Sequence, residues 1–164
     1  QSLRWSQLSG GGPAEFTDFF ADGGDYISLG NRGQGVGFAL DAGIVDVDFA
    51  ADPSNAIVRM SSVGDSDITS GFEMDSTVFV YRPVWFTRLG DGVEVAANYA
   101  SDDFLVAGYW PDWPTSGAAG SPMIVYSTHN DTGDSVLLGL DSTFRGHPED
   151  AFRLLGNAIY HGLD

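Results

Sequence analysis

The sequence contains no cysteine and no lysine among its 164 residues. Without cysteine, the chain can form neither disulfide bonds nor thiolate metal sites, and it has no cysteine nucleophile. It also lacks a run of about eighteen apolar residues, and it lacks a charged segment followed by a short apolar one. We therefore expect neither a membrane span nor a signal peptide within it, and an export signal would have to lie outside this stretch.

Positive charge is scarce as well. The seven basic residues are all arginine, and with 23 Asp and Glu residues they give a formal net charge of -16 at pH 7. A protein of this charge repels phosphate backbones and anionic lipid headgroups. We therefore expect no nucleic acid partner and no insertion into a membrane.

Apolar residues are plentiful, at 43% of the chain, which is enough for the core of one domain over residues 1–164. Runs rich in β-branched and aromatic residues, separated by Gly and Asp turns, predict strands. These runs span 25–29, 56–63, 77–89, 93–100 and 104–110. Pro83 is expected to mark an edge, a bulge or a break within the third run. Two nearly continuous apolar runs, 121–127 and 135–140, predict central strands buried on both faces.

Helical patterns lie on either side of the first strand, over 13–21 and 36–43, and again at the end of the chain. The last helix begins at Pro148, with an apolar face expected from Phe152, Leu154, Leu155, Ala158 and Ile159. This order of elements predicts a three-layer α/β domain. Its central sheet would be mixed and largely parallel, with a β-rich insertion in the middle.

Several segments together resemble a known family: "GDYISLGNRGQGVGFA", "AANYASDDFLVAGYW", "AAGSPMIVYS", "SVLLGLDSTFRG" and "FRLLGNAIY". Their order and spacing, over about 8–160, are similar to the glutamine amidotransferase-like domain appended to bacterial zinc carboxypeptidases of the carboxypeptidase A/T type. The resemblance implies a class I glutamine amidotransferase-like, or flavodoxin-like, fold. It also implies a non-catalytic accessory domain cut from a longer, secreted or cell-surface bacterial protein. Its partner would be that protein's own upstream catalytic domain, and the zinc would lie there.

In true amidotransferases a cysteine on a strained strand-to-helix turn is activated by a His and a Glu two residues apart. His147 and Glu149 match that pair, whereas the nucleophile position holds Ser28 or Asn31, depending on register. These four residues are therefore interpreted as vestigial, and His147-Pro148-Glu149 is more typical of a helix start. A serine hydrolase is the less favoured alternative, because it would need a base in reach and an oxyanion hole.

The sequence predicts no metal site. A zinc peptidase site requires a His-x-x-Glu pair, and none of the three histidines, His129, His147 and His161, has Glu three positions later. The aspartate pairs at 46–48 and 65–67 lack a full calcium loop pattern and are typical of solvated turns. We expect no cofactor in this chain.

The loop over 108–120, "GYWPDWPTSGAAG", concentrates aromatic side chains between prolines. Tyr109, Trp110 and Trp113, joined by Trp85, are candidates for a surface that stacks on sugar rings or on a peptide, or that contacts a neighbouring domain. The equally favoured interpretation is that the tryptophans close one end of the core. A carbohydrate- or peptide-binding module is therefore the alternative function.

Overall fold

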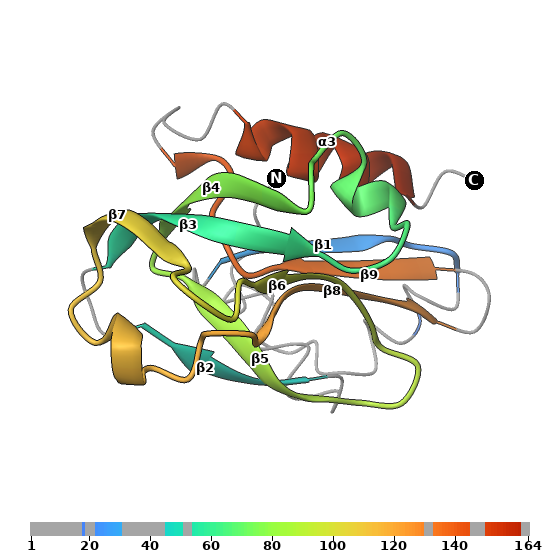
Figure 1. Cartoon of the computed structure of the whole chain (residues 1–164). Helices are drawn as coiled ribbons and strands as arrows, with labels where there is room; N and C mark the ends of the chain where they lie inside the picture. The colour runs from blue at the N-terminus through green and yellow to red at the C-terminus, as the bar shows by residue number, and fades with distance from the viewer. Residues whose placement is uncertain are drawn as a thin grey trace.

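The structure, a computed structural model, describes residues 18, 22–30, 45–50, 54–129, 133–144 and 150–161. Figure 1 shows a curled sheet with a helix against one face and a small second sheet below it. The strands are β1 (Tyr26–Leu29), β2 (Val45–Phe49), β3 (Asn55–Ser62), β4 (Asp75–Tyr81), β5 (Val84–Leu89), β6 (Glu94–Tyr99), β7 (Leu105–Tyr109), β8 (Pro122–His129) and β9 (Gly133–Leu138). The described helices are α3 (Ala151–His161) and two short 3-10 turns, η2 (Asp67–Thr69) and η3 (Trp113–Thr115).

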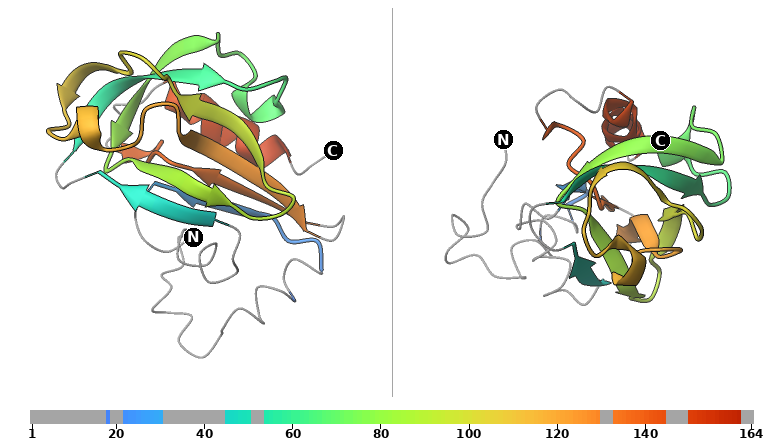
Figure 2. Two further views of the ribbon diagram at one scale, coloured as in Figure 1. Left: turned by 60° about the horizontal axis from the view of Figure 1, so that its bottom comes forward. Right: turned by 60° about the vertical axis from the view of Figure 1, so that its left-hand side comes forward.

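The main sheet has seven strands in the order β1-β9-β8-β6-β3-β4, and β7 pairs with β3 beside β6. β1 runs parallel to β9, and the other pairings of this sheet are antiparallel. β3 carries β4 along one edge. Its other edge is shared between β7 at Asn55–Val58 and β6 at Met60–Ser62. This sharing lets β3, β4 and β7 curl away from the plane of β1, β9 and β8 (Figure 2).

The second sheet consists of β2 and β5, which pair antiparallel. It is joined to the main sheet at Gly139, just after β9. The Gly139 N–H donates to the Met123 carbonyl (2.8 Å), and the Gly139 carbonyl accepts from the Val84 N–H (2.9 Å). A β-carbon at position 139 would lie closer than 3.0 Å to the carbonyl oxygens of both Val84 and Met123. Glycine is therefore required where the two sheets meet.

β9 contributes to the core on both of its faces. Val136 and Leu138 pack in one cluster with Ala151, Leu154 and Ala158 of α3. Leu137, which points the other way, packs in a second cluster with Val84 and Phe86 of β5. The main sheet is thus covered by α3 on one side and by the β2-β5 sheet on the other. The prediction that the two late strands are central and buried on both faces is confirmed.

The C-terminal helix is present, but its buried face differs from the predicted one. Ala151, Leu154 and Ala158 are buried, at the i, i+3 and i+7 spacing of one helix face. Phe152 and Ile159 are exposed, because they flank this stripe rather than lie on it. α3 is tied to η2 through Asn157, whose Nδ2 donates to the Ile68 carbonyl (3.0 Å) and the Ser70 carbonyl (2.9 Å).

The predicted strands are all present, and Pro83 marks a break, because β4 ends at Tyr81 and β5 begins at Val84 in another sheet. The β-rich middle is likewise confirmed. The mixed sheet is correct, but "largely parallel" is wrong for the part of the chain that the structure describes, where β1-β9 is the parallel pair. β3-β4 and β8-β9 are consecutive antiparallel strands, whereas β3-β6, β3-β7 and β6-β8 pair strands that are not consecutive in the chain. The helices predicted over 13–21 and 36–43 lie outside the described residues, apart from Asp18.

Candidate functional site

The ends of β1 and β9 meet at one edge of the sheet, because these strands run parallel. Ligands of open α/β sheets bind outside the carboxyl ends of parallel strands. β1 leads into Gly30, whose φ of +52° lies in the left-handed region, and β9 leads on to Asp141. A β-carbon on Gly30 would come within 3.0 Å of the Asp141 backbone nitrogen, so the two turns are in direct contact. We take this edge as the candidate site.

Ser28, a predicted nucleophile position, lies inside β1 rather than on the turn after it. It pairs with Leu137 and is 3% exposed. A nucleophile on a strand-to-helix elbow stands on a strained turn that exposes its side chain. Among the described non-glycine residues, a positive φ occurs at Arg82 and Asp103. The strand therefore holds Ser28 in a different setting from a nucleophile elbow.

The other three vestigial candidates, Asn31, His147 and Glu149, lie outside the described residues. Their assignment to the site stays a prediction. The interpretation that all four residues are vestigial also stays a prediction.

Two buried polar residues at this edge were missed by the sequence analysis. Asp141 is 6% exposed, and its Oδ1 accepts hydrogen bonds from the Thr143 N–H (3.1 Å) and from the Thr143 hydroxyl (2.8 Å). Ser142 is fully buried, and its hydroxyl has no hydrogen-bond partner among the described residues. The available signal was the Asp-Ser-Thr run directly after an apolar strand, which is typical of an Asx turn. The carboxylate thus holds the turn that follows β9.

One histidine side chain, that of His161, is described, and it lies at the end of α3 against Tyr126 of β8. The two rings meet edge to face with centroids 5.0 Å apart. The Tyr126 hydroxyl donates to Glu94 Oε2 (3.0 Å). Burial raises the pKa of Tyr126, and the neighbouring Glu94 carboxylate raises it further. The His161 imidazole therefore lies with Tyr126 of β8 and Glu94 of β6.

The aromatic residues of the 108–120 loop extend a buried aromatic cluster. Trp110 packs edge to face on Tyr99 (centroids 5.9 Å apart) and on Phe104 (5.2 Å), and it lies 5.9 Å from Trp85. The Tyr99 hydroxyl donates to the Val84 carbonyl (3.0 Å), which ties the cluster to β5. The two indole N–H groups have no conventional acceptor among the described residues. Edge-to-face packing of this kind contributes beyond the area it buries.

A surface that presents all four predicted rings is therefore wrong. Trp85 and Trp110 are each 2% exposed, and Trp113 is half-buried against Phe104. Tyr109, at 55% exposure, is the member that solvent reaches most. Trp110 lies just after β7 and packs in the aromatic cluster, whereas Tyr109, the last residue of β7, lies opposite the exposed Asn55 of β3. The interpretation that the tryptophans close the core is correct for Trp85 and Trp110.

The acidic residues form no metal centre in the described part of the chain, where no group of three or more His, Asp or Glu side chains is placed to hold an ion. Asp46 and Asp48 lie on β2 and not in the turn that was predicted. Asp46 pairs with Arg88 across the small sheet (2.7 Å). Asp65 lies in a bend and Asp67 is the first residue of η2, and both are exposed, as expected for solvated residues. None of the helices described is long and apolar enough to cross a bilayer.

Comparison with known proteins identifies structures with a similar fold. No protein-family model matches the sequence, and no curated protein is significantly similar to it. Solved structures do match. A GMP synthase subunit protein from Thermoplasma acidophilum superposes with a TM-score of 0.60 at 15% identity, over 96% of this chain and 66% of that one. PurLQS from Thermotoga maritima matches with a TM-score of 0.56 at 14% identity, over 97% and 73%.

The mmIFT52 N-terminal domain also matches, with a TM-score of 0.59 at 11% identity, over 93% of this chain and 70% of that one. The chain thus spans 66% of the length of the GMP synthase subunit protein. Identities this low carry the fold alone. The fold is of the glutamine amidotransferase-like type.

Proposed function

We propose that this chain is a non-catalytic accessory domain built on a glutamine amidotransferase-like fold. One observation carries the proposal: the chain has no cysteine, so the fold lacks the nucleophile on which amidotransferase chemistry depends. The serine in the corresponding strand, Ser28, is buried within the β1-β9 ladder, which supports the same proposal.

The proposal extends to the protein around the domain. The order and spacing of the segments over about 8–160 resemble the domain appended to bacterial zinc carboxypeptidases. On that basis the parent protein is a secreted or cell-surface metallocarboxypeptidase, its catalytic domain lies upstream, and zinc is bound there. The domain then packs against the catalytic domain and stabilises it or positions its substrate. The same proposal takes the complete fold as a three-layer α/β domain, with the helices that the sequence predicts over 13–21 and 36–43.

The full-length reading frame tests this proposal first. An upstream domain with a His-x-x-Glu zinc motif is expected. The purified full-length protein and a form lacking this domain would then be compared for carboxypeptidase activity and for thermal stability. We expect the shortened form to keep zinc and to lose stability or the efficiency kcat/KM. A frame without a peptidase domain, or glutaminase activity in this chain alone, would overturn the proposal.

A carbohydrate- or peptide-binding role through the 108–120 loop remains the second candidate, because Tyr109 is well exposed at its start. Quenching of protein fluorescence by oligosaccharides or peptides, lost in Tyr109→Ala, would support it. The serine hydrolase alternative requires ester cleavage that Ser28→Ala abolishes.

A further inference from the structure

β7 has one edge that no other described strand covers. It pairs with β3, and no other described strand pairs with it, so half of its backbone hydrogen-bonding groups face away from the sheet. Four of its five residues, Val106 to Tyr109, are exposed. Such an edge is a template for another strand unless charge, proline, a bulge or a covering element protects it, and the β3-β7 pairing has a register shift between Ile57 and Val58, near the start of β7. β7, "LVAGY", contains neither charge nor proline.

The surface around this edge is apolar. Val106 is 45% exposed and Tyr109 is 55% exposed. Ile57 on β3, at 41%, lies opposite Ala107 in the ladder. Ile57 and Tyr109 lie on the same face, because Ile57 pairs with Ala107, two residues before Tyr109, whereas Val106 lies on the other face. An added strand would therefore meet apolar side chains on both of its faces.

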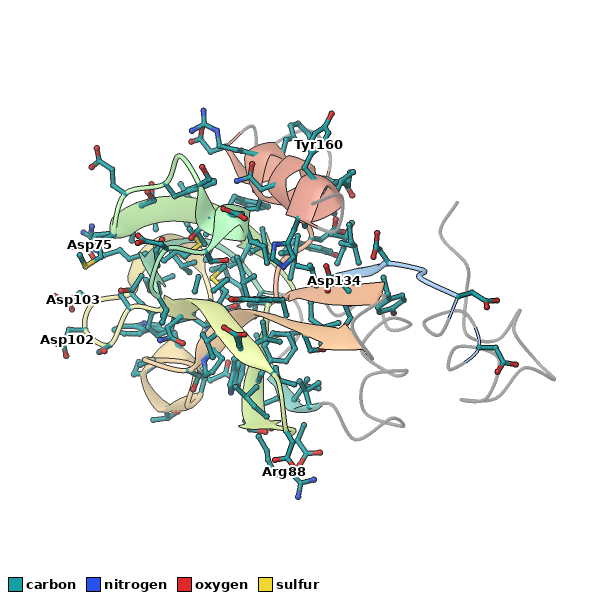
Figure 3. The ribbon with its side chains drawn as sticks, turned by 90° about the vertical axis from the view of Figure 1, so that its right-hand side faces the viewer. Asp75, Arg88, Asp102, Asp103, Asp134 and Tyr160 are labelled. Atoms are coloured by element: carbon teal, nitrogen blue, oxygen red, sulfur yellow. The ribbon has the colours of Figure 1, made fainter. Side chains whose placement is uncertain are left out.

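Carboxylates stand at both ends of the strand. Asp102 and Asp103 precede β7, and they project side by side from the surface (Figure 3). Asp103 has a φ of 45°, a left-handed turn conformation that aspartate tolerates better than most residues. Asp112 follows the strand, just before η3. Arg59 on β3 donates its backbone N–H to the Phe104 carbonyl (2.7 Å), and Arg82 follows Tyr81, which pairs with Asn55 opposite Tyr109. The three carboxylates outnumber these two guanidinium groups.

These charges decide what can occupy the edge. A second copy pairing antiparallel through β7 would place Asp102 and Asp103 of one molecule beside Asp112 of the other. It would also bring together two chains that each carry a net charge of -16. Like charges brought together across an interface oppose association. A strand with basic residues at its ends is instead attracted to β7, because carboxylates lie at both ends of β7.

We propose that the free edge of β7 binds an extended segment of a partner protein, which has an apolar centre of about five residues flanked by Lys or Arg at both ends. The segment adds to the sheet as a strand. Its main-chain N–H and C=O groups bond to the free edge, and its apolar side chains rest on Val106, Tyr109 and Ile57. Its basic ends pair with Asp102, Asp103 and Asp112. This inference goes beyond the accessory role and does not depend on the presence of a peptidase domain.

The test uses a synthetic peptide of about nine residues, with alternating Val and Thr in the centre and Lys-Arg at each end. Binding is measured by fluorescence anisotropy at low salt, and it is localised by amide hydrogen exchange over residues 105–109. Two control peptides accompany it. One has Glu in place of the basic ends, and the other keeps the charges but has proline in the centre. Each control is expected to bind at least about 10-fold more weakly, because it loses charge attraction or strand hydrogen bonds.

The matched protein variants carry the same change in charge at different places. Asp102→Lys with Asp112→Lys should weaken binding of the basic peptide about 10-fold or more. Asp48→Lys with Asp91→Lys, at exposed positions on β2 and in the β5-β6 turn, should change it less than about 2-fold. Protection of the 105–109 amides by the basic peptide would support the proposal.

Three results would overturn it. The first is that the basic peptide does not bind. The second is that the proline peptide binds equally well, which would mean that the acidic protein attracts any basic peptide. Concentration-dependent dimerisation in sedimentation, with protection of the same amides, would assign the edge to a second copy instead. A loss of stability in the shortened parent protein would leave these outcomes unchanged, so the two proposals fail separately.

Discussion

β9 and β7 have similar apolar sequences, but β9 is buried and β7 is largely exposed. Both are uncharged apolar runs, "SVLLGL" and "FLVAGYW". In the fold, Leu137 and Leu138 of β9 are 1% exposed, whereas Tyr109 of β7 is 55% exposed. β9 lies between β1 and β8, with a core on each face, whereas β7 has one described neighbouring strand. The apolar run predicts a strand, but the number of neighbours decides how much of that strand is buried.

Replacing Gly139 should have the largest effect on stability, because it disrupts the junction between the two sheets at the end of β9. Gly139→Ala would push a β-carbon against the carbonyl oxygens of Val84 and Met123, neither of which is a movable side chain. We expect a loss of about 4 kcal/mol or more in the free energy of unfolding, measured in urea. Gly156→Ala is the matched control. It meets open space on α3 and should stabilise the protein by about 0.5–1 kcal/mol. A small loss at position 139 would mean that the two sheets are not fixed to each other there.

Two adjacent residues at the end of β7 provide the next test. Trp110→Ala should cost about 3–5 kcal/mol, because it empties the centre of the aromatic cluster. Tyr109→Ala, one residue earlier on the open face, should cost less than about 1 kcal/mol. Urea unfolding of both variants, with tryptophan emission as the probe, gives the comparison. Equal losses would show that the outer face of β7 is buried after all.

Alkaline pH should separate buried from exposed tyrosines. Burial raises the pKa of Tyr26 from 10.0 to about 12, and it raises that of the fully buried Tyr99 still further. Above the unfolded value, the unfolded chain loses these protons before the folded chain does. Stability should therefore fall as the pH rises from about 10 towards 12. Tyrosinate absorbance and unfolding curves measure the two effects. Tyr26→Phe should reduce this fall, and an unchanged slope in that variant would contradict the assignment.

The smallest effect is expected at the ion pair on the small sheet. The Arg88 and Asp46 side chains are 77% and 46% exposed, so solvent screens their attraction. Arg88→Ala should change the free energy of unfolding by less than about 0.5 kcal/mol, within the range usual for exposed pairs. A salt titration of both proteins checks this, since a stronger pair would make the wild-type protein more sensitive to salt. A cost above about 1 kcal/mol would show that β2 depends on this pair.

Much of the secondary structure could be predicted from local sequence. Pro83 separates β4 from β5, and the runs around Val136 and Ile124 become central strands, because backbone chemistry and apolar content act over a few residues. The direction of pairing and the burial of single rings could not be predicted. Trp85 and Trp110 meet across the fold, and their burial depends on Tyr99 and Phe104 from other segments.

The candidate site shows the same limit. Ser28 was identified from its place in a strand that resembles the amidotransferase one, but its burial follows from the pairing with Leu137, which is distant in sequence. Asp141 and Ser142 carry a local Asx-turn signal, but their burial beside Gly30 depends on the fold and not on the local sequence. The contact between Gly30 and Asp141 depends on the parallel pair and could be found only in three dimensions.

The parallel pairing of β1 with β9 also has a consequence for biosynthesis. β1 is the first described strand and β9 is the last, so a ribosome must make nearly all of the intervening chain before β1 can bond to its neighbour. Contacts between such distant segments slow folding, because a long loop must close before they form. The β3-β4 hairpin can form early during translation, whereas the edge bearing Gly30 and Asp141 assembles only after β9 has emerged. A pulse of protease during synthesis would therefore cut the β1 region until β9 has emerged from the ribosome.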